Sequence, residues 1–369
     1  MIAFDNVTKF YPDGTVAVDR LSFVAPTAKI TILVGPSGCG KTTSLRMINR
    51  LIEPSSGVIT LNGQSTQDMD VVRLRRKIGY VIQNAGLFPH KTVQDNVAVT
   101  ARLNGATRHA ARKTALDLLA RVGLSPEMGQ RYPWQLSGGQ QQRVGVARAL
   151  ASDPEFMLMD EPFSAVDPVV REQLQDEFLR LQSDIGKTII MVTHDIDEAM
   201  KLGDRVAVFR PGGRLAQIDA PSRLLNHPGD AFVADFIGRD RGYRKLAFSA
   251  IPSGLALSSE PCAAVGMPVA EARERAQGRW ILVTADNQPL GWFDVAQPKS
   301  HILAGDINLS GTFAPLSGSL RQLMDAVLSS PSGRGIVVDD NRQLLGSVNI
   351  EQAFGAARQP MDVEQRHAV

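Results

Sequence analysis

The stretch GPSGCGKTT, residues 35–43, decides the fold class of this 369-residue chain. An apolar run before it, residues 29–34, predicts a short buried strand, and residues 41–51 predict a helix after it. Gly35, Gly38 and Gly40 allow the backbone between them to turn sharply and to point its N–H groups at phosphate oxygens. Strand, glycine-rich loop and helix together predict a phosphate-binding loop in an α/β fold.

The residues of this loop have different expected roles. Lys41 is expected to reach the β- and γ-phosphates of a nucleotide, and Thr42 to bind Mg²⁺. The N-terminus of the helix adds partial positive charge. The other expected nucleotide contacts are Gly35, Pro36, Ser37, Gly38, Cys39, Gly40 and Thr43. A chance glycine-rich turn is the alternative, and the full spacing between a strand and a helix argues against it.

A second apolar run, residues 156–159, predicts another buried strand, and it ends in Asp160 and Glu161. Carboxylates at the C-terminal end of such a strand project toward the ligand site. We expect Asp160 to hold Mg²⁺ through water and Glu161 to be the general base that polarises the attacking water. The alternative is a carboxylate pair that only caps the turn at Pro162.

The pentapeptide LSGGQ, residues 136–140, lies between the phosphate loop and the acidic strand. Ser137 is a suitable N-cap for a helix over residues 138–151, whose apolar face is Val144, Ala147 and Leu150. A serine and two glycines at a helix start form a concavity for anions. The expected contacts are Ser137, Gly138, Gly139 and Gln140. A helix cap without a ligand is the alternative.

In this order, the three motifs resemble the ATP-binding cassette (ABC) family, and the resemblance covers residues 1–238. It implies an α/β P-loop NTPase, a RecA-like core with a helical subdomain, that binds ATP and Mg²⁺. The resemblance also places Gln83, after a strand at 78–82, as the glutamine that senses Mg²⁺ and the attacking water. His194, in VTHD after a strand at 188–193, is similar to the histidine that contacts the γ-phosphate.

Two further positions carry roles by resemblance. Tyr11 stands where the family has an aromatic ring that stacks on adenine; packing at a sheet edge is the alternative. Asp167 ends SAVD, residues 164–167, which resembles the loop that crosses between subunits. The family more often has leucine where Val166 stands, a conservative departure.

Each chain carries one phosphate loop and one LSGGQ, and in the family LSGGQ meets the nucleotide of the other subunit. The resemblance therefore implies a head-to-tail homodimer that ATP closes and hydrolysis releases. It also implies that the mostly helical stretch 84–135 grips a membrane permease, with residues 84–90 at the socket. A solute-binding protein would then be an indirect partner.

Composition restricts the remaining classes of function. Forty basic and 38 acidic residues leave a net charge of +2, which gives no indication of nucleic-acid binding. Two cysteines cannot form a disulfide framework, and a reducing cytosol is the natural compartment. No apolar run nears the roughly 18 residues of a membrane span, and the N-terminus has no signal-peptide pattern. We expect a peripheral protein on the cytoplasmic face of the inner (plasma) membrane.

The composition changes after Gly238. Residues 239–246 predict a charged linker, residues 247–360 a smaller α+β domain, and residues 361–369 a tail. Within this domain RWILVTADNQPLGWFDVAQ, from Arg279, matches RGIVVDDNRQLLGSVNIEQ, from Arg334, at a spacing of about 55 residues. Each copy predicts strand, turn and strand after a helical stretch, at 269–277 and 320–328. The repeat resembles a tandem CBS pair, a regulatory module attached to transporter ATPases.

The repeat departs from CBS modules that bind adenine nucleotides. Those modules carry Thr or Ser and, three residues later, Asp after the second strand. The positions here hold Asp294 and Gln297 in the first copy, and Asn349 and Gln352 in the second. Sensing of ionic strength, another ligand, and a role in dimerisation or padding all stay open.

The solute class is indicated by resemblance alone. Residues 74–97 and 131–150, with the CBS-like repeat, resemble importer ATPases for quaternary ammonium osmoprotectants: glycine betaine, choline and carnitine. An importer ATPase for another solute, of the methionine or other amino-acid type, is an alternative. A soluble cassette protein acting on ribosomes or DNA is a second alternative, which the single ATPase unit and the absence of sustained heptads disfavour.

Overall fold

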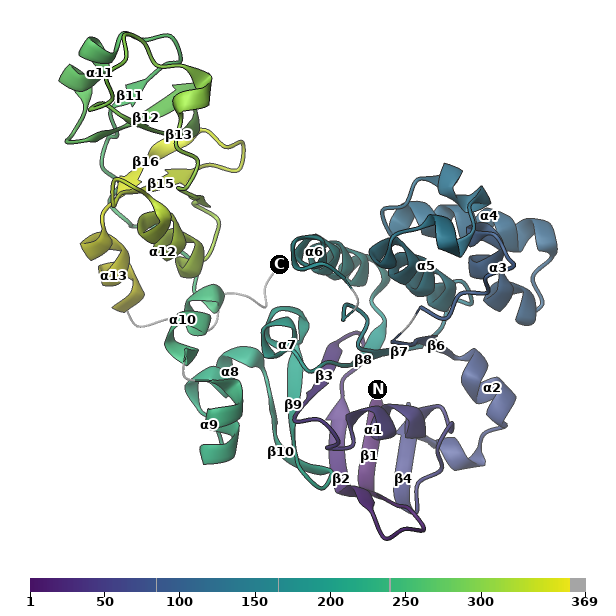
Figure 1. Ribbon diagram of the computed structural model, residues 1–369. Coiled ribbons are helices and arrows are strands. Elements are labelled where there is room, and N and C mark those ends of the chain that lie inside the picture. Colours follow the sequence, from purple (N-terminus) through teal and green to yellow (C-terminus); the bar gives the residue numbers. More distant parts are fainter. Residues whose placement is uncertain (84, 165, 239, 359–369) are drawn as a thin grey trace. The chain divides into compact units, whose positions relative to one another are not determined.

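A computed structural model describes residues 1–83, 85–164, 166–238 and 240–358. The chain divides into two compact units, Met1–Ile237 and Gly238–Val369, and each is described here by itself (Figure 1). Three predicted positions, Asn84, Ala165 and Arg239, lie outside the described residues, as does the predicted tail. No helix among the described residues is long and apolar enough to cross a membrane.

The centre of the first unit is a six-stranded sheet in the order β10-β9-β3-β8-β7-β6. Five strands are parallel, and β10 is antiparallel to β9 at the edge. Every residue of β3, β7 and β8 is buried, as expected for parallel strands covered on both faces. The bounds are β3 Ile30–Val34, β6 Ile78–Val81, β7 Phe156–Asp160, β8 Thr188–Val192, β9 Arg205–Arg210 and β10 Arg214–Asp219.

A second, antiparallel sheet has the order β2-β1-β4-β5. Its strands are β1 Ile2–Phe10, β2 Val16–Ala25, β4 Ser56–Leu61 and β5 Gln64–Ser65. One apolar core joins this sheet to the parallel sheet and to α1, Lys41–Ile48, through buried side chains such as Phe4, Leu45 and Phe156. Full burial of each such side chain contributes about 2 kcal/mol. Helix α1 ends at Ile48, three residues before the predicted end, because Arg50 adopts a left-handed φ of +54°.

Helices fill the stretch between β6 and β7 (Figure 1). They are α3 Val93–Leu103, α4 Arg108–Arg121 and α5 Gly138–Leu150, with short 3-10 helices at Pro126–Gln130 and Pro133–Gln135. Thr92, Thr107 and Ser137 cap α3, α4 and α5 with their hydroxyl oxygens. The remaining helices of this unit are α2 Val71–Arg76, α6 Pro168–Ile185, α7 Ile196–Leu202, α8 Pro221–Asn226, α9 Ala231–Ile237 and the 3-10 turn Thr66–Asp68.

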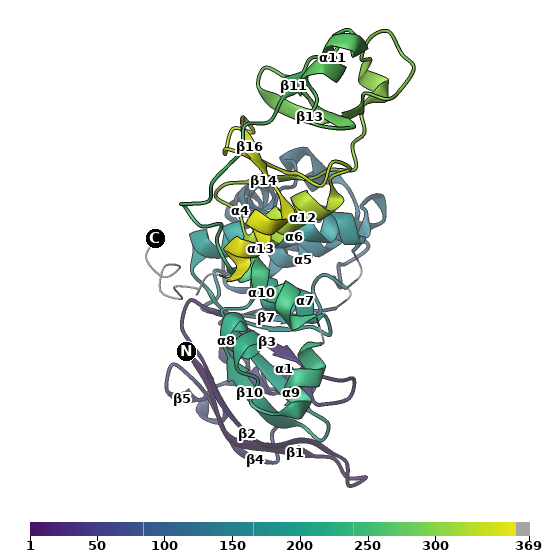
Figure 2. The same cartoon turned by 90° about the vertical axis from the view of Figure 1, so that its left-hand side faces the viewer.

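The second unit contains two three-stranded sheets of the same design, β11-β12-β13 and β14-β15-β16. In each, a parallel pair is followed by an antiparallel hairpin, with one helix between the first two strands. The bounds are β11 Cys262–Ala263, α11 Val269–Arg275, β12 Trp280–Ala285, β13 Gln288–Asp294, β14 Phe313–Pro315, α12 Leu320–Ser329, β15 Gly335–Val338, β16 Leu344–Val348 and α13 Ile350–Arg358, with a 3-10 turn at Ala304–Asp306. Figure 2 shows the second sheet lying between the first sheet and helix α10, Arg241–Lys245.

The two copies of the repeat share an unusual backbone conformation at one equivalent glycine. Gly291 and Gly346 are equivalent in the aligned sequences, and their φ angles are +153° and +152°. A Cβ atom would lie 2.6 Å from the carbonyl oxygen of Asn308 at Gly291 and 2.7 Å from that of Ser258 at Gly346. The two halves of this unit are joined by an ion pair in which the half-buried Arg334 guanidinium donates to the buried Glu260 carboxylate at 2.8–3.1 Å.

The segment predicted as a linker, residues 239–246, differs from that expectation. It contains helix α10, Arg241–Lys245, followed by a 3-10 turn at Leu246–Phe248. Tyr243 and Leu246 pack against the core of the second half, and the Tyr243 hydroxyl donates to Asp325 on α12. These contacts make the segment part of the second unit.

Candidate functional site

The phosphate loop connects β3 to α1, and its glycines adopt backbone conformations that other residues rarely reach. The φ angle is +154° at Gly35, +77° at Gly38 and +87° at Gly40. A Cβ atom on Gly40 would lie 2.1 Å from the carbonyl oxygen of Ala17, so the loop is pressed against β2. A Cβ atom on Gly38 would meet no atom within 4 Å. The tip of the loop is therefore open on its outer side.

The side chains of the loop divide between the interior and the surface. Ser37 at the tip is exposed, whereas Cys39 points inward and is 1% exposed. Burial raises the pKa of the Cys39 thiol, so this cysteine packs as a neutral side chain. Pro36 and Thr43 are half-buried.

Lys41 is folded back onto its own loop. Its Nζ donates to the carbonyl oxygens of Gly35 at 2.8 Å and Pro36 at 3.0 Å, and the residue is only 8% exposed. Carbonyl oxygens are neutral acceptors, and charged phosphate oxygens make stronger hydrogen bonds with an ammonium group. The Lys41 ammonium group is therefore held within the loop, and phosphate oxygens can replace the two carbonyl oxygens as its acceptors.

Thr42 and Asp160 meet at the start of α1. The Thr42 hydroxyl donates to Asp160 Oδ1 at 3.0 Å, and the guanidinium of Arg46 lies 3.8 Å from Oδ2. Burial is the main reason that the pKa of the Asp160 carboxyl is raised. A hydroxyl beside a buried carboxylate fits Mg²⁺, which takes few protein oxygens and completes its shell with phosphate and water. No group of three or more acidic, histidine or cysteine side chains that could hold a metal ion is found among the described residues.

The carboxylate of Glu161 is held between two side chains from neighbouring strands. Its Oε2 accepts from Gln83 Nε2 at 3.0 Å, and its Oε1 lies 3.3 Å from His194 Nδ1. The three residues follow β7, β6 and β8, which are adjacent in the sheet, so parallel topology gathers them at one edge. Glu161 has a φ of +48°, a conformation typical of functional sites for a residue with a side chain.

The start of α5 is capped by a reciprocal pair of hydrogen bonds. Ser137 Oγ accepts from the Gln140 backbone N–H at 3.3 Å, and Gln140 Oε1 accepts from the Ser137 N–H at 3.0 Å. The Gln140 side chain is therefore used to cap the helix. The Ser137 hydroxyl hydrogen and the N–H groups of Gly138 and Gly139 remain at an exposed helix start, where anions bind.

These contacts assemble two clusters from the predicted residues: Lys41, Thr42 and Asp160 form one, and Gln83, Glu161 and His194 form the other. Among the described residues, no hydrogen bond or ion pair joins Ser137 or Gln140 to the phosphate loop. Figure 1 shows α5 grouped with α3 and α4, whereas α1 lies beside the sheets.

Tyr11 and Asp167 lie outside both clusters. Tyr11 begins the turn after β1, where its N–H donates to Thr15 O, and Lys9 Nζ lies 5.3 Å from its ring centroid. Asp167 is exposed just before α6, and its carbonyl oxygen accepts from the Arg171 N–H.

Sequence reasoning missed two members of the site. Arg46 is one helical turn after Thr42 and reaches Asp160, a spacing that could have indicated it. Gln142 lies on α5 and donates to the backbone carbonyl of Gln83 at 2.8 Å, across 59 residues of sequence. Its only sequence signal is a polar side chain within an otherwise apolar buried face.

Comparisons with known proteins show which family the chain resembles. Residues 18–164 match the ABC transporter family. The choline transport ATP-binding protein OpuBA of Bacillus subtilis is 40% identical, over 94% of each chain. The osmoprotectant import ATP-binding protein OsmV of Salmonella typhimurium is 41% identical, over 95% of this chain and 94% of its own.

Solved structures resemble the first part of the chain. The ATP-binding cassette MJ0796, solved as a dimer in a post-hydrolysis state bound to ADP and Pi, is 32% identical with a TM-score of 0.54. The match covers 60% of this chain and 99% of that one.

Proposed function

This chain belongs to the ABC transporter family of ATP-binding proteins, and we propose that it is the ATP-hydrolysing subunit of an importer for quaternary ammonium osmoprotectants. Glycine betaine, choline and carnitine are the candidate solutes. The observation that carries this proposal is similarity over 94% of the chain, second unit included, to relatives named for choline and osmoprotectant transport. The relative named for glycine betaine, carnitine and choline transport, OpuCA of Bacillus subtilis, is 38% identical over the same share.

ATP binding is assigned to the phosphate loop. Lys41 exchanges its two carbonyl acceptors for phosphate oxygens, and the N-terminus of α1 adds partial positive charge. Thr42 and Asp160 would hold Mg²⁺, which when bound offsets negative charge on the phosphates. Tyr11 is proposed as the adenine contact.

Hydrolysis is assigned to the Glu161 cluster. The carboxylate accepts a proton from the attacking water, and Gln83 and His194 orient that carboxylate from both sides. Gln83 is also proposed to contact the attacking water and the metal, and His194, whose side chain is 64% exposed, is proposed to contact the γ-phosphate.

The proposal includes a homodimer. One chain carries one phosphate loop and one exposed α5 start, so a complete site needs the α5 start of a second chain. The dimeric structures of MJ0796 support this arrangement. Asp167 is proposed to lie at the same interface. ATP would close the dimer, and hydrolysis would release it.

The proposed transporter role implies which proteins this chain binds and where in the cell it acts. Integral permease subunits are the proposed direct partners, at the helical stretch 84–135, and a solute-binding protein is an indirect one. The protein would then act peripherally at the cytoplasmic face of the inner (plasma) membrane.

The second unit is proposed to be a tandem CBS-like regulatory domain, residues 247–360. Its two equivalent sheets support this. At the positions where such modules bind nucleotides, side chains of this chain form other hydrogen bonds. Asp294 accepts from the Arg279 guanidinium at 2.7 and 3.0 Å. Asn349 and Gln352 cap the start of α13, each accepting from the other's backbone N–H. Adenine nucleotides are therefore poor candidates for its ligand.

Uptake by the source cell tests the proposal. Disruption of the gene should abolish uptake of a radiolabelled quaternary amine at high osmolarity. The wild-type gene should restore uptake, and the Lys41→Ala variant should not. Loss of amino-acid uptake instead would favour the other importer type. Recovery of the tagged chain with ribosomes or DNA rather than a membrane protein would overturn the transporter role.

A further inference from the structure

Helix α5 holds the backbone that follows β6. Gln142 Nε2 donates to Gln83 O at 2.8 Å, and the Arg148 guanidinium donates to Ala85 O at 2.6 Å and Gly86 O at 2.7 Å. These three hydrogen bonds run from one helix to one short segment, and α5 also packs directly against β6. The backbone of Gln83, Ala85 and Gly86 is therefore held to α5.

The direction of the Gln142 bond is unambiguous. A backbone carbonyl can only accept, so the amide nitrogen of Gln142 must face Gln83. Gln142 is 4% exposed, and its Oε1 has no hydrogen-bond partner among the described residues. An unsatisfied buried carbonyl oxygen costs about 1–3 kcal/mol. A polar residue kept at that cost indicates a role other than stability.

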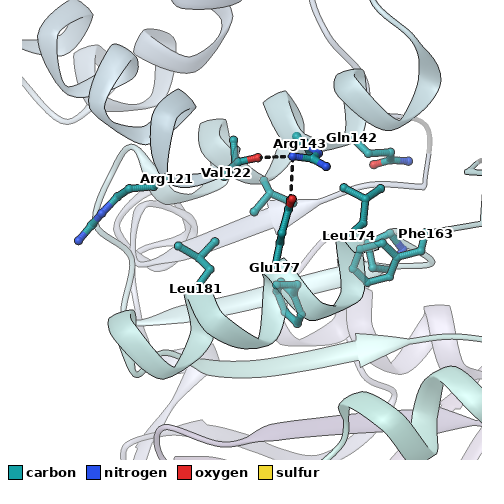
Figure 3. Close-up of a pocket in the computed structure, with 11 residues that line it drawn as sticks. Arg121, Val122, Gln142, Arg143, Phe163, Leu174, Glu177 and Leu181 are labelled. Atoms are coloured by element: carbon teal, nitrogen blue, oxygen red, sulfur yellow. Dashed lines mark hydrogen bonds and ion pairs between the residues drawn. The ribbon is translucent and has the colours of Figure 1, made fainter. Parts of the chain in front are cut away.

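A small cavity adjoins this residue. It has a volume of about 40 Å³ and lies between α5 and α6, bordered by Gln142, Leu174 and Phe163 (Figure 3). A volume of this size admits a water molecule. Besides Gln142, the polar side chains that line the cavity are Arg121, Arg143 and Glu177. Among the described residues, the Gln83 carbonyl is the one hydrogen-bond partner of the Gln142 side chain.

Gln83 is also the residue that contacts Glu161. Its backbone carbonyl accepts from Gln142, while its side-chain amide donates to Glu161 Oε2 at 3.0 Å. Because the backbone position of Gln83 decides where its amide can reach, a shift of α5 changes the position of a group that orients the Glu161 carboxylate.

We propose that Gln142 is a positioning residue that, with Arg148, couples the start of α5 to the hydrolytic Gln83–Glu161 pair of the same chain. Helix α5 has 13 residues and is about 20 Å long. Ser137 caps its start, and Gln142 follows little more than one turn later, so both belong to one rigid element. Docking of a partner at Ser137 is thereby transmitted to Gln83 through Gln142, and to Ala85 and Gly86 through Arg148. This inference rests on the proposed function for its assignment of Gln83 and Glu161.

Steady-state ATP hydrolysis by the full-length chain tests the role of Gln142. Gln142→Met keeps the length of the side chain and removes the amide, and we expect kcat to fall about 5–20-fold with KM for ATP unchanged. The matched control is Gln94→Met. Gln94 is 6% exposed on α3 and donates to Arg112 O at 3.0 Å, and among the described residues no hydrogen bond joins its side chain to Gln83, Ala85 or Gly86. The control should keep its kcat, and wild-type kcat in the Gln142 variant would overturn the proposal.

A double-mutant cycle separates positioning from structural damage. In a Gln83→Ala background, Gln142→Met should lower kcat by less than about twofold, because the route through Gln83 is already lost. An equal factor in both backgrounds would overturn the proposal and leave the proposed function intact. Normal kcat in Gln83→Ala alone would contradict the assigned role of Gln83 and would overturn both. If Gln142→Met does not fold, Gln142→Asn, one methylene shorter, replaces it, with Gln94→Asn as control.

Discussion

Alanine at Gly40 and alanine at Gly38 should destabilise the first unit to different extents. Both glycines have left-handed φ angles, +87° and +77°, so each alanine carries about 1–2 kcal/mol of backbone strain. Only at Gly40 would the new Cβ atom meet another group, the carbonyl oxygen of Ala17 at 2.1 Å.

The clash determines the expected difference. A backbone oxygen cannot rotate away as a side chain can, so β2 or the loop must move, at an extra cost of about 2 kcal/mol. For a unit of this size, about 2 kcal/mol lowers the melting temperature by roughly 4–8 °C. Gly40→Ala should melt lower than Gly38→Ala by that amount.

Differential scanning calorimetry of the nucleotide-free, full-length variants measures this difference. The transition of the second unit serves as an internal control, since neither glycine belongs to it. Equal lowering of the first transition in both variants would refute the close approach of the loop to β2.

The remaining predictions concern nucleotide binding, pH and the second unit. Lys41→Ala should lose ATP affinity in equilibrium titrations, because no other side chain in the loop supplies a cation; unchanged affinity would contradict the loop assignment. Burial raises the pKa of the Glu198 carboxyl, so its stabilising contribution is present at low pH and is lost as the pH rises through that raised pKa. Glu198→Gln should therefore raise the free energy of unfolding at neutral pH and leave it unchanged in acid, and a gain at every pH would argue against this cause. Arg334→Met should cost the second unit about 3–5 kcal/mol by leaving Glu260 buried without its partner, and Glu260→Gln added to it should recover part of the loss in calorimetry.

Much of the hydrolytic site could be predicted because its signals are local. A buried parallel strand needs a continuous apolar run, and a phosphate loop needs glycines at set positions, so the runs before Gly35 and Asp160 indicated both strands. Parallel topology then places the ends of neighbouring strands together. Gln83 and His194 were indicated by resemblance to the ABC family, and the structure brings both to Glu161 at that edge of the sheet.

Contacts between distant residues could not be predicted in this way. The bond from Gln142 to Gln83 depends on how α5 packs on β6, and no spacing in the sequence encodes it. The charged composition of residues 239–246 is typical of a linker, yet Tyr243 within it is held by Asp325 and by the Arg321 guanidinium, 5.1 Å from its ring. The composition of a short segment cannot indicate that Tyr243 contacts residues about 80 positions later in the sequence.

The central claim is that one site is completed by two chains, and sedimentation of Glu161→Gln tests it most directly. This variant keeps the oxygen that accepts from Gln83 and loses the base, so with ATP and Mg²⁺ it should shift from the 40.0 kDa monomer to a dimer of twice that mass. Adding Ser137→Arg, which fills the exposed start of α5, should keep the chain monomeric although its own phosphate loop is unchanged. A dimer that still forms with Ser137→Arg would contradict the claim.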